Sequence, residues 1–455
     1  MYHKVKEIEH NYDVENIRYK GSYVWAYLRL SYYWKSIEEI TCKSENKKKT
    51  FFIINWIQYF KKAFYGFFNW FHSYEYLFFS DTQERISFKN NYVDKSFEEI
   101  INNLGNEKCL CIDTPNPEHL SIDKIKNNIV SHAMLKIIIS ISSKLSSIFN
   151  KVSINIKLLD TICTNENLYV DYALLIKRFD ITVKCYTLLF KIYKPKAIFI
   201  SCYYCNQAII KAANDLNIET IEMQHGNIGD SHTAYNFYCN ADKSFYPSTL
   251  LTYGEYDKNI LSKSQYTPFE NIVPVGNYNL ELIEEQNISS ELLALVSAYK
   301  TVVSISTQYI VEEKMAKFMK QVAIENEDTV FLFSLRHFSK SFYKQFDMPK
   351  NVFLFKGEYS CYEILRVSSI HMTCSSTCAT EAFFFRKKII LVDIDELAIK
   401  SSFGSMNTSN ISIIRDVEEF VKLDKKYQDV ENNFYVYEYS KRIESWVKGL
   451  ENKND

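Results

Sequence analysis

Short apolar runs alternate with helical segments along most of this 455-residue chain. AIFISC (197–202) reads as a buried strand, residues 206–216 as a helix, and ETIEMQ (219–224) as a second strand. A strand, a helix and a strand within about 30 residues form a βαβ unit, which places its strands parallel in one sheet. The pattern therefore predicts an α/β protein built on parallel sheets.

This alternation occurs twice. The first series has strands at 74–80, 108–113, 197–202 and 219–224, and the second has strands at 301–306, 329–334, 351–355, 369–374, 388–393 and 411–414. The chain has only 10 glycines and 7 prolines, yet Pro268, Pro274 and Gly276 cluster between the two series. We therefore expect two doubly wound, Rossmann-like domains facing a central cleft, since open α/β sheets bind ligands at the carboxyl ends of their strands.

The predicted organisation has four parts. An aromatic-rich helical N-terminal extension covers 1–73, the first domain 74–280, the second domain 281–432, and a C-terminal helix lies within 433–455.

Composition and charge exclude several classes of protein. A net charge of -1 provides no general attraction to nucleic acid. Eleven cysteines behind a polar, charged N-terminus with no secretory signal indicate reduced thiols and a cytoplasmic protein.

Residues 51–71 are rich in aromatic side chains but are interrupted by Asn55, Gln58, Lys61, Lys62 and Asn69, so they do not form a membrane span. Lysines beside Trp and Phe at helical spacing are typical of an interfacial helix. The segment either contacts a membrane surface peripherally or packs its aromatic side chains on the protein's own core.

The glycine-containing turn QHGNIG follows strand 219–224 directly. His225 stands at the strand's carboxyl end, where an imidazole whose pKa lies near neutrality can act as a general base. Gly226 permits a tight turn with close backbone approach to a ligand. Asp230, His232 and Tyr235 could orient a hydroxylated substrate. The alternative is a turn whose histidine makes only structural hydrogen bonds.

A second motif, CSSTCATEA, joins strand 369–374 to a helix. Ser375, Ser376 and Thr377 meet the unpaired N–H groups of a helix N-terminus, an arrangement suited to phosphate. A helix cap alone would explain one of these hydroxyls but not three. Glu381, one turn further on, could pair with a ribose diol or simply favour the helix dipole.

Other strand ends carry weaker candidates. Arg336 and His337 follow strand 329–334, where a cation could stabilise a leaving phosphate, and Thr307 follows strand 301–306. Asp393 and Asp395 have the DxD spacing of some metal sites, but we interpret them as loop acids.

Two candidates lie at strand ends of the first series. Tyr203 and Tyr204 stand inside a lone CxxC, which favours packing over zinc, and could stack on a sugar. Asp113 ends strand 108–113 and, with Glu118 and His119, is a reserve acid/base candidate.

Four segments resemble glycosyltransferases of bacterial capsule and lipopolysaccharide loci. QHGNIGD with the following His232 and Tyr235 resembles their QHG-type motif, and residues 375–393 resemble the phosphate and nucleotide segment of the GT-B fold. Residues 249–281 resemble the stretch that leads into the second domain, and KGSYVWAYLR (20–29) resembles an N-terminal feature of these proteins. The sequence departs from the family at RKK (386–388), where Gly-Lys-Pro is usual, and it lacks the His-Pro dipeptide of sialyl-type and glycerophosphate-type transferases.

The resemblance implies a GT-B glycosyltransferase whose C-terminal helix packs back on the first domain. It would move a sugar from a nucleotide-sugar donor to a glycan or lipid-linked acceptor in surface-polysaccharide biosynthesis, with no metal or other cofactor. The catalytic candidates are His225, Asp230 and Asp113. The donor candidates are Ser375, Ser376, Thr377, Glu381, Arg336, His337 and Thr307. The acceptor candidates are Gln224, Gly226, His232, Tyr203 and Tyr204.

Three alternatives remain open at this point. A CDP-polyol phosphotransferase would use the same site, and a nucleotide-sugar epimerase of the same fold would turn over its substrate with no acceptor. A non-catalytic polysaccharide assembly protein would bind no nucleotide.

Overall fold

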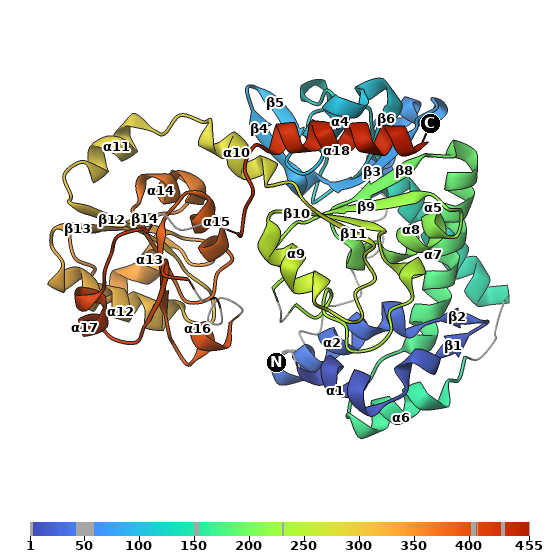
Figure 1. Cartoon of the computed structure of the whole chain (residues 1–455), viewed down its shortest axis with the longest axis horizontal. Helices are drawn as coiled ribbons and strands as arrows, with labels where there is room; N and C mark the ends of the chain where they lie inside the picture. Colours follow the sequence, from blue (N-terminus) through green and yellow to red (C-terminus); the bar gives the residue numbers. More distant parts are fainter. Residues whose placement is uncertain are drawn as a thin grey trace. The chain divides into compact units, whose positions relative to one another are not determined.

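The computed structural model describes residues 3–41, 59–149, 154–229, 232–401, 406, 408–428 and 433–454. The chain forms two compact units (Figure 1). The first unit comprises Met1–Tyr253, Asp257–Tyr278 and Glu438–Asp455, and the second comprises Gly254–Tyr256 and Asn279–Tyr437.

The first unit is built on a seven-stranded, all-parallel sheet of order β11-β10-β9-β8-β3-β6-β7. Its strands are β3 (Tyr76–Asp81), β6 (Cys109–Thr114), β7 (Ile129–Ser131), β8 (Ala197–Ile200), β9 (Glu219–Met223), β10 (Thr249–Thr252) and β11 (Asn271–Pro274). Two antiparallel ribbons accompany it, β1 (Arg18–Tyr19) with β2 (Ser22–Tyr23) and β4 (Arg85–Phe88) with β5 (Asn91–Asp94).

Helices cover both faces of this sheet because its strands are apolar on both sides. Leu77 and Phe79 of β3 pack into one core cluster, while Tyr76 and Phe78 pack into the other. The helices of the first unit are α1 (His3–Asn11), α2 (Trp25–Thr41), α4 (Glu98–Leu104), α5 (Ala133–Phe149), α6 (Lys157–Asn165), α7 (Tyr172–Tyr193), α8 (Gln207–Asn214), α9 (Glu255–Ser262, which begins in the second unit) and α18 (Tyr439–Asn454).

The C-terminal helix α18 belongs to the first unit and lies along α4 (Figure 1). Tyr439, Ile443, Val447 and Leu450 form an apolar stripe at helical spacing, and this stripe is buried in the core of the first unit. Tyr439 also donates a hydrogen bond to the Ser96 carbonyl, 3.4 Å away.

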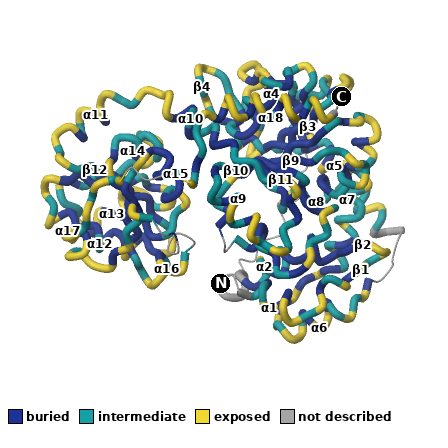
Figure 2. Tube along the Cα trace, in the orientation of Figure 1, coloured by how far each residue is buried: buried dark blue, intermediate teal, exposed yellow. Residues whose placement is uncertain are grey.

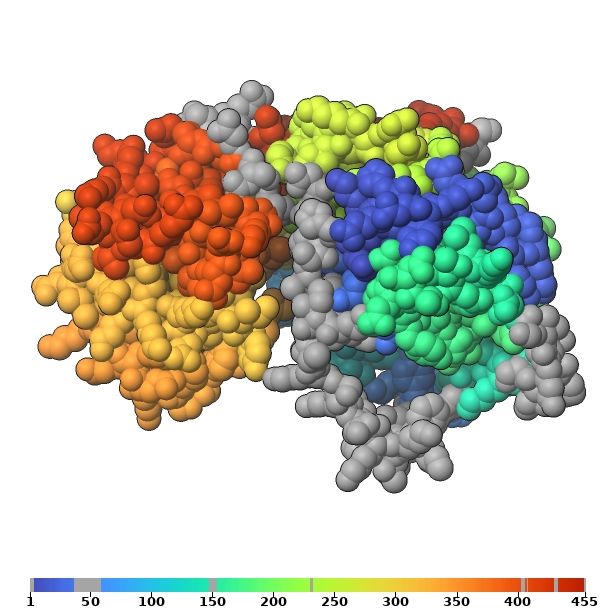
Figure 3. Space-filling view, turned by 90° about the horizontal axis from the view of Figure 1, so that it is seen from below, coloured from blue at the N-terminus to red at the C-terminus, as the bar shows by residue number. Residues whose placement is uncertain are grey.

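The N-terminal helices are part of the first unit's core. Trp25, Leu28 and Tyr32 of α2 are fully buried in it. Helix α6 lies beside α1, as Figure 3 shows from below, and Lys4 pairs with Glu166 at 2.6 Å.

The second unit repeats the plan with a six-stranded parallel sheet of order β14-β13-β12-β15-β16-β17. Its strands are β12 (Thr301–Ser306), β13 (Thr329–Ser334), β14 (Val352–Phe355), β15 (Ile370–Thr373), β16 (Lys388–Val392) and β17 (Ile411–Ile414). Its helices are α10 (Tyr278–Glu284), α11 (Ser290–Val296), α12 (Glu312–Glu325), α13 (Lys340–Tyr343), α14 (Cys361–Val367), α15 (Cys378–Phe384), α16 (Leu397–Lys400) and α17 (Val417–Lys422). Its central strands are buried, as in the first unit (Figure 2).

No helix in the described part of the chain is both long enough and apolar enough to cross a membrane.

Candidate functional site

The order of the first sheet reverses between β3 and β8. From β3 the chain continues outward through β6 and β7, whereas from β8 it continues the other way through β9, β10 and β11. The connections therefore diverge at the carboxyl ends of β3 and β8, and open α/β sheets bind ligands at such switch points.

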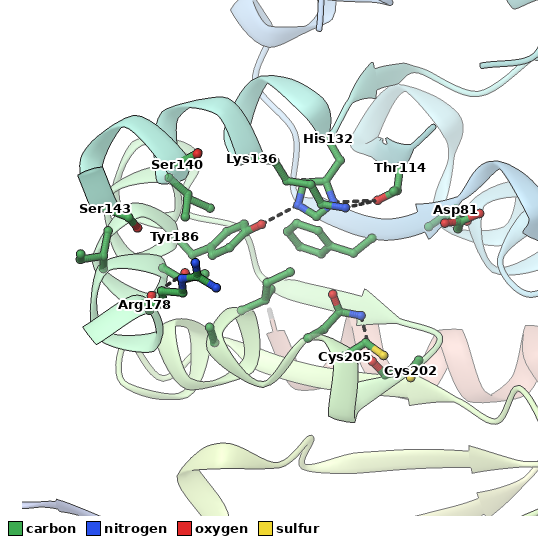
Figure 4. Close-up of a pocket in the computed structure, with 18 of the residues that line it drawn as sticks. Asp81, Thr114, His132, Lys136, Ser140, Ser143, Arg178, Tyr186, Cys202 and Cys205 are labelled. Carbon is green, nitrogen blue, oxygen red and sulfur yellow. Dashed lines mark hydrogen bonds between the residues drawn. The ribbon is translucent and has the colours of Figure 1, made fainter. Parts of the chain in front are cut away.

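A pocket of about 840 Å³ lies at this switch point, within the first unit (Figure 4). Ser80 and Asp81 of β3, Thr114 of β6 and Ser201 after β8 line its strand edge. Helices α5 and α7 contribute the walls, and Figure 4 shows Ser140 and Ser143 of α5 near Arg178 of α7. The pocket is large enough for a small organic ligand.

A buried histidine connects the strand edge of the pocket to helix α7. His132, before α5, is 5% exposed, and its Nδ1 lies 2.9 Å from the Thr114 hydroxyl while its Nε2 contacts the Tyr186 hydroxyl of α7. Burial lowers the pKa of His132 to about 3, with Lys136 adding to the effect. The ring is therefore neutral at neutral pH and serves as a hydrogen-bonding link.

His225, the predicted base, lines the pocket at the end of β9. Its Nε2 lies 3.0 Å from the Tyr204 hydroxyl. Loss of hydration among the surrounding groups lowers the pKa of His225 to about 4, with His232 and Lys95 adding to the effect, although the residue is exposed. His225 is thus neutral at neutral pH, and a ring nitrogen can accept a hydrogen bond or a proton. Its catalytic role stays a prediction.

Gln224, predicted to contact the acceptor, is buried and shapes the turn instead. Its Nε2 donates to Asp257 Oδ2 at 2.7 Å, and its Oε1 accepts from the Tyr253 N–H at 2.7 Å. Gly226 has open space where a Cβ would lie, whereas Gly229 adopts a φ of 49°, a left-handed conformation that favours glycine. Asp230 lies outside the described residues.

The two adjacent tyrosines have different environments. Tyr203 is 1% exposed and its hydroxyl donates to the Ala234 carbonyl, so its ring is not available for stacking on a ligand. Tyr204 contacts His225 and, with His232, lines a separate cavity of about 150 Å³ beside Tyr33 and Trp34 of α2.

A buried ion pair holds the loop after His225 in place. Arg29 donates through Nε to Glu9 at 2.7 Å, and through Nη1 and Nη2 to the carbonyls of Thr233 and Asn236 at 2.6 and 2.9 Å. Arg29 is 2% exposed. Segment 20–29, which contains Arg29, thereby ties the N-terminal helices to this loop.

Asp113 does not line the pocket. Its carboxylate is 1% exposed and contacts Arg85 Nε at 3.3 Å, His119 Nδ1 at 3.3 Å and the Thr82 hydroxyl at 3.1 Å. Asp81, whose β3 position pairs in register with Thr114, lines the pocket instead, together with Glu84.

Several pocket residues were missed from the sequence. Asp81 directly follows the predicted strand 74–80, so extending that strand by one residue would have found it. Lys136, Ser140, Ser143 and Lys144 form a polar stripe at helical spacing along α5, whose other residues are mostly apolar. Such a stripe in the sequence indicates a helix with one face toward a polar site.

The second unit has its switch point between β12 and β15, where the predicted donor residues lie. Gln308 Oε1 accepts from the Ser375 N–H at 3.1 Å and from its hydroxyl at 2.7 Å, while Ser376 Oγ accepts from the Cys378 N–H at 3.3 Å. Thr377 is exposed and its side chain does not cap α15. The three hydroxyls thus have three different environments, and only that of Ser376 accepts a bond from the start of the helix.

The remaining donor candidates lie on the same edge of this sheet or one turn away. Thr307 follows β12 and is buried, with no partner for its Oγ1 among the described residues. Glu381 accepts from the Tyr362 hydroxyl at 3.0 Å. Arg336 and His337 follow β13 and are exposed.

Both acids of the DxD sequence are paired with cations. Asp395 contacts Lys314 at 2.6 Å, and Asp393 Oδ2 accepts from Arg415 Nε at 3.4 Å. Across the described ranges, no group of three or more His, Cys, Asp or Glu side chains is placed to hold a metal ion.

Comparisons with known proteins identify the fold. No protein-family model matches the sequence, and no curated protein matches it. Among solved structures, the chain is similar to a Listeria monocytogenes protein provisionally named a UDP-N-acetylglucosamine 2-epimerase, at 10% identity over 84% of this chain and 98% of that one, with a TM-score of 0.52.

Two further structures are more distant. The UDP-GlcNAc 2-epimerase of Neisseria meningitidis, solved with UDP-GlcNAc bound, is 12% identical over 83% of this chain and 99% of its own, with a TM-score of 0.49. The glycotransferase of kitacinnamycin is 9% identical over 83% and 94%, with a TM-score of 0.41. At these identities the Listeria likeness shows the fold alone, and it confirms the predicted GT-B class of two Rossmann-like domains.

Proposed function

We propose that the protein is a glycosyltransferase that moves a sugar from a nucleotide-sugar donor to a glycan or glycolipid acceptor. The observation that carries this proposal is the pocket at the switch point of the first sheet. A hydroxyl-rich loop, suited to a nucleotide phosphate, lies at the switch point of the other sheet. A transferase needs a site for each of two substrates, whereas an epimerase needs one.

His225 is the proposed base for the acceptor hydroxyl. Its ring is neutral at neutral pH and can take the proton as the hydroxyl oxygen attacks the donor's anomeric carbon, although a pKa of about 4 makes it a weaker base than a free imidazole. The Tyr204 hydroxyl, 3.0 Å from Nε2, would orient the ring. Asp81, on the same pocket wall, is the second candidate base.

Ser375, Ser376 and Thr377, the neighbouring backbone N–H groups and Arg336 would stabilise the departing nucleotide phosphate. Preorganised donors of this kind can neutralise a leaving group without a metal ion. A chelator should therefore leave the transfer rate unchanged, and a large loss would direct attention to Asp393 and Asp395. Replacing Ser376 and Thr377 together with alanine should weaken donor binding about tenfold.

The setting that fits this activity is bacterial capsule or O-antigen synthesis at the cytoplasmic membrane surface. Of the predicted membrane segment, residues 51–58 lie outside the described part of the chain. The remainder presents Phe60, Phe64, Phe68 and Phe71, which are 49–81% exposed. Co-sedimentation with anionic vesicles tests this contact, and an alanine variant of the four phenylalanines that still sediments would refute it.

A nucleotide-sugar epimerase is the second candidate, because the Listeria protein that shares the fold carries that provisional name. The two activities separate in one assay. The purified chain is incubated with a nucleotide-sugar, with and without a glycan acceptor, and the products are separated by chromatography. Turnover without acceptor supports the epimerase, and transfer that requires the acceptor supports the transferase.

A thermal-shift screen against CMP, CDP, UDP, GDP and dTDP should precede that assay. A shift with one nucleotide would assign the donor class, and a shift with a cytidine nucleotide alone would keep the CDP-polyol phosphotransferase open. No shift with any of them would favour a non-catalytic assembly protein and refute the proposal.

A further inference from the structure

Cations are concentrated on the helical walls of the pocket in the first unit. Lys136 of α5 and Lys177 and Arg178 of α7 all line it, as does Lys144 of α5. Lys136, Lys177 and Arg178 form no ion pair with any carboxylate that the structure describes. Three cations on the walls of one pocket, with no anionic partner, would attract an anion that enters it.

The acids that line the same pocket do not balance this charge. Asp81 and Glu84 are its two carboxylates. Glu84 contacts Lys95 at 3.3 Å and accepts from the Ser96 hydroxyl at 3.3 Å. Asp81 caps a short helical turn by accepting from the Gln83 N–H at 2.9 Å. Lys136, Lys177 and Arg178 face two acids, one of which is already paired with Lys95, so the pocket carries a positive excess.

Lys136 illustrates the missing anionic contact. Its Nζ donates to the Thr114 hydroxyl at 3.4 Å, a neutral acceptor at the strand edge. Partial loss of hydration lowers the pKa of Lys136 although the residue is exposed, and attraction from Asp81 and Cys205 opposes the shift only in part. The ammonium has therefore lost part of its hydration without gaining an anionic contact in return.

The rest of the lining suits a phosphorylated glycan. Hydroxyls of Ser140, Ser143 and Thr182 lie on the same walls as the cations, and Phe79, Ile139 and Ile181 supply an apolar surface. A guanidinium such as that of Arg178 matches phosphate oxygens with two parallel N–H donors, and hydroxyls add further hydrogen bonds. The apolar side chains can contact the non-polar face of a sugar ring.

We infer that this pocket binds an acceptor that carries a phosphate or diphosphate group, held between Lys136 and the Lys177–Arg178 pair. That the bound molecule is an acceptor rests on the proposed transferase function. That the pocket binds an anion rests on the pocket alone. The inference goes beyond that function by naming the chemical class of the acceptor.

The test uses the full chain and inorganic pyrophosphate as the probe, measured by titration calorimetry. The variant Lys177→Gln/Arg178→Gln removes two charges from the pocket wall. The matched control Lys184→Gln/Lys191→Gln removes two charges from α7 at positions that do not line the pocket. Both variants change partly or fully exposed side chains, so neither should unfold the protein.

We expect the pocket variant to bind pyrophosphate at least about tenfold more weakly than the control, because each lost cation removes a charge-assisted hydrogen bond. Pyrophosphate could also bind the loop at 375–377, so both variants are titrated again with Ser376→Ala/Thr377→Ala added. If the tenfold difference persists in this second background, the effect lies in the first unit. Equal affinities for pocket variant and control would overturn the inference.

A second measurement separates a lipid headgroup from a soluble phosphate. The variants are co-sedimented with phosphatidylcholine vesicles, with and without phosphatidic acid. If the pocket variant also loses the vesicle binding that depends on phosphatidic acid, the anion belongs to a lipid-linked acceptor. If only its pyrophosphate binding falls, the anion belongs to a soluble acceptor. The transferase proposal can fail while the anion site holds. In that case the protein binds no nucleotide, but pyrophosphate still binds the pocket.

Discussion

Glu222 provides a direct test of the structure around the pocket. This β9 carboxyl is fully buried, and its Oε1 accepts from the Tyr203 N–H at 3.0 Å and from the Tyr235 hydroxyl at 2.7 Å. Its Oε2 has no hydrogen-bond partner among the described residues. The donors are neutral, so they compensate only in part for the loss of hydration of a buried charge.

Burial raises the pKa of Glu222 from 4.5 to about 8. The folded protein therefore holds a proton that the unfolded chain releases at neutral pH. The resulting stabilisation is complete below the unfolded pKa of 4.5 and is lost as pH rises through the folded pKa of about 8. Each pKa unit corresponds to about 1.4 kcal/mol, so the whole change amounts to about 3–5 kcal/mol.

The perturbation is Glu222→Gln, which keeps the shape and both accepted hydrogen bonds but cannot ionise. We expect a variant that is within about 1 kcal/mol of the natural protein at ~pH 5 and about 3–5 kcal/mol more stable once pH exceeds ~8. Other buried acids titrate too, but they contribute equally to both proteins, and the difference between the two pH profiles isolates Glu222.

The assay is urea unfolding at a series of pH values. Unfolding is monitored by hydrogen exchange of the β8 and β9 amides, so that the signal reports on the first unit. Glu219→Gln, at the partly exposed start of the same strand, is the control. Parallel pH profiles for the natural protein and Glu222→Gln would refute the reasoning, since they would mean that this carboxyl is ionised or hydrated in the folded state.

Three further outcomes are expected. Arg29→Met should cost the first unit about 3–5 kcal/mol in urea unfolding, because Glu9 stays buried without its cation, and a cost below about 1 kcal/mol would contradict this. His225→Ala should lower the sugar-transfer rate at least about 100-fold with an unchanged melting temperature, and near-normal turnover would exclude it as the base. Gly254→Ala should destabilise the second unit, because its Cβ would lie 2.4 Å from a backbone carbonyl, whereas the matched Gly226→Ala, with open space at its Cβ, should melt like the natural protein.

The sequence predicted the architecture well because it depends on local periodicity. Apolar runs of strand length alternating with amphipathic helices allow few arrangements other than parallel sheets. The same rule predicted that His225, Thr307 and Ser375 follow strands, since consecutive parallel strands end at one edge of a sheet. The positions of these residues at the strand ends can therefore be predicted without the tertiary structure.

The tertiary structure decided which neighbours of those residues reach the pocket. Tyr203 and Tyr204 are adjacent, yet one is sealed beneath the loop that Arg29 ties to the N-terminal helices and the other contacts His225. Asp81 ends β3, whereas Asp113 is the penultimate residue of the neighbouring β6; Asp113 therefore pairs in register with Ser80, and Asp81 pairs with Thr114.

Side chains alternate between the two faces of a sheet, so a shift of one residue exchanges a pocket carboxylate for a buried one. Sequence periodicity determined the strands and the edge at which they end. Register and long-range packing, which depend on residues as far apart as Arg29 and Thr233, decided which side chains line the pocket.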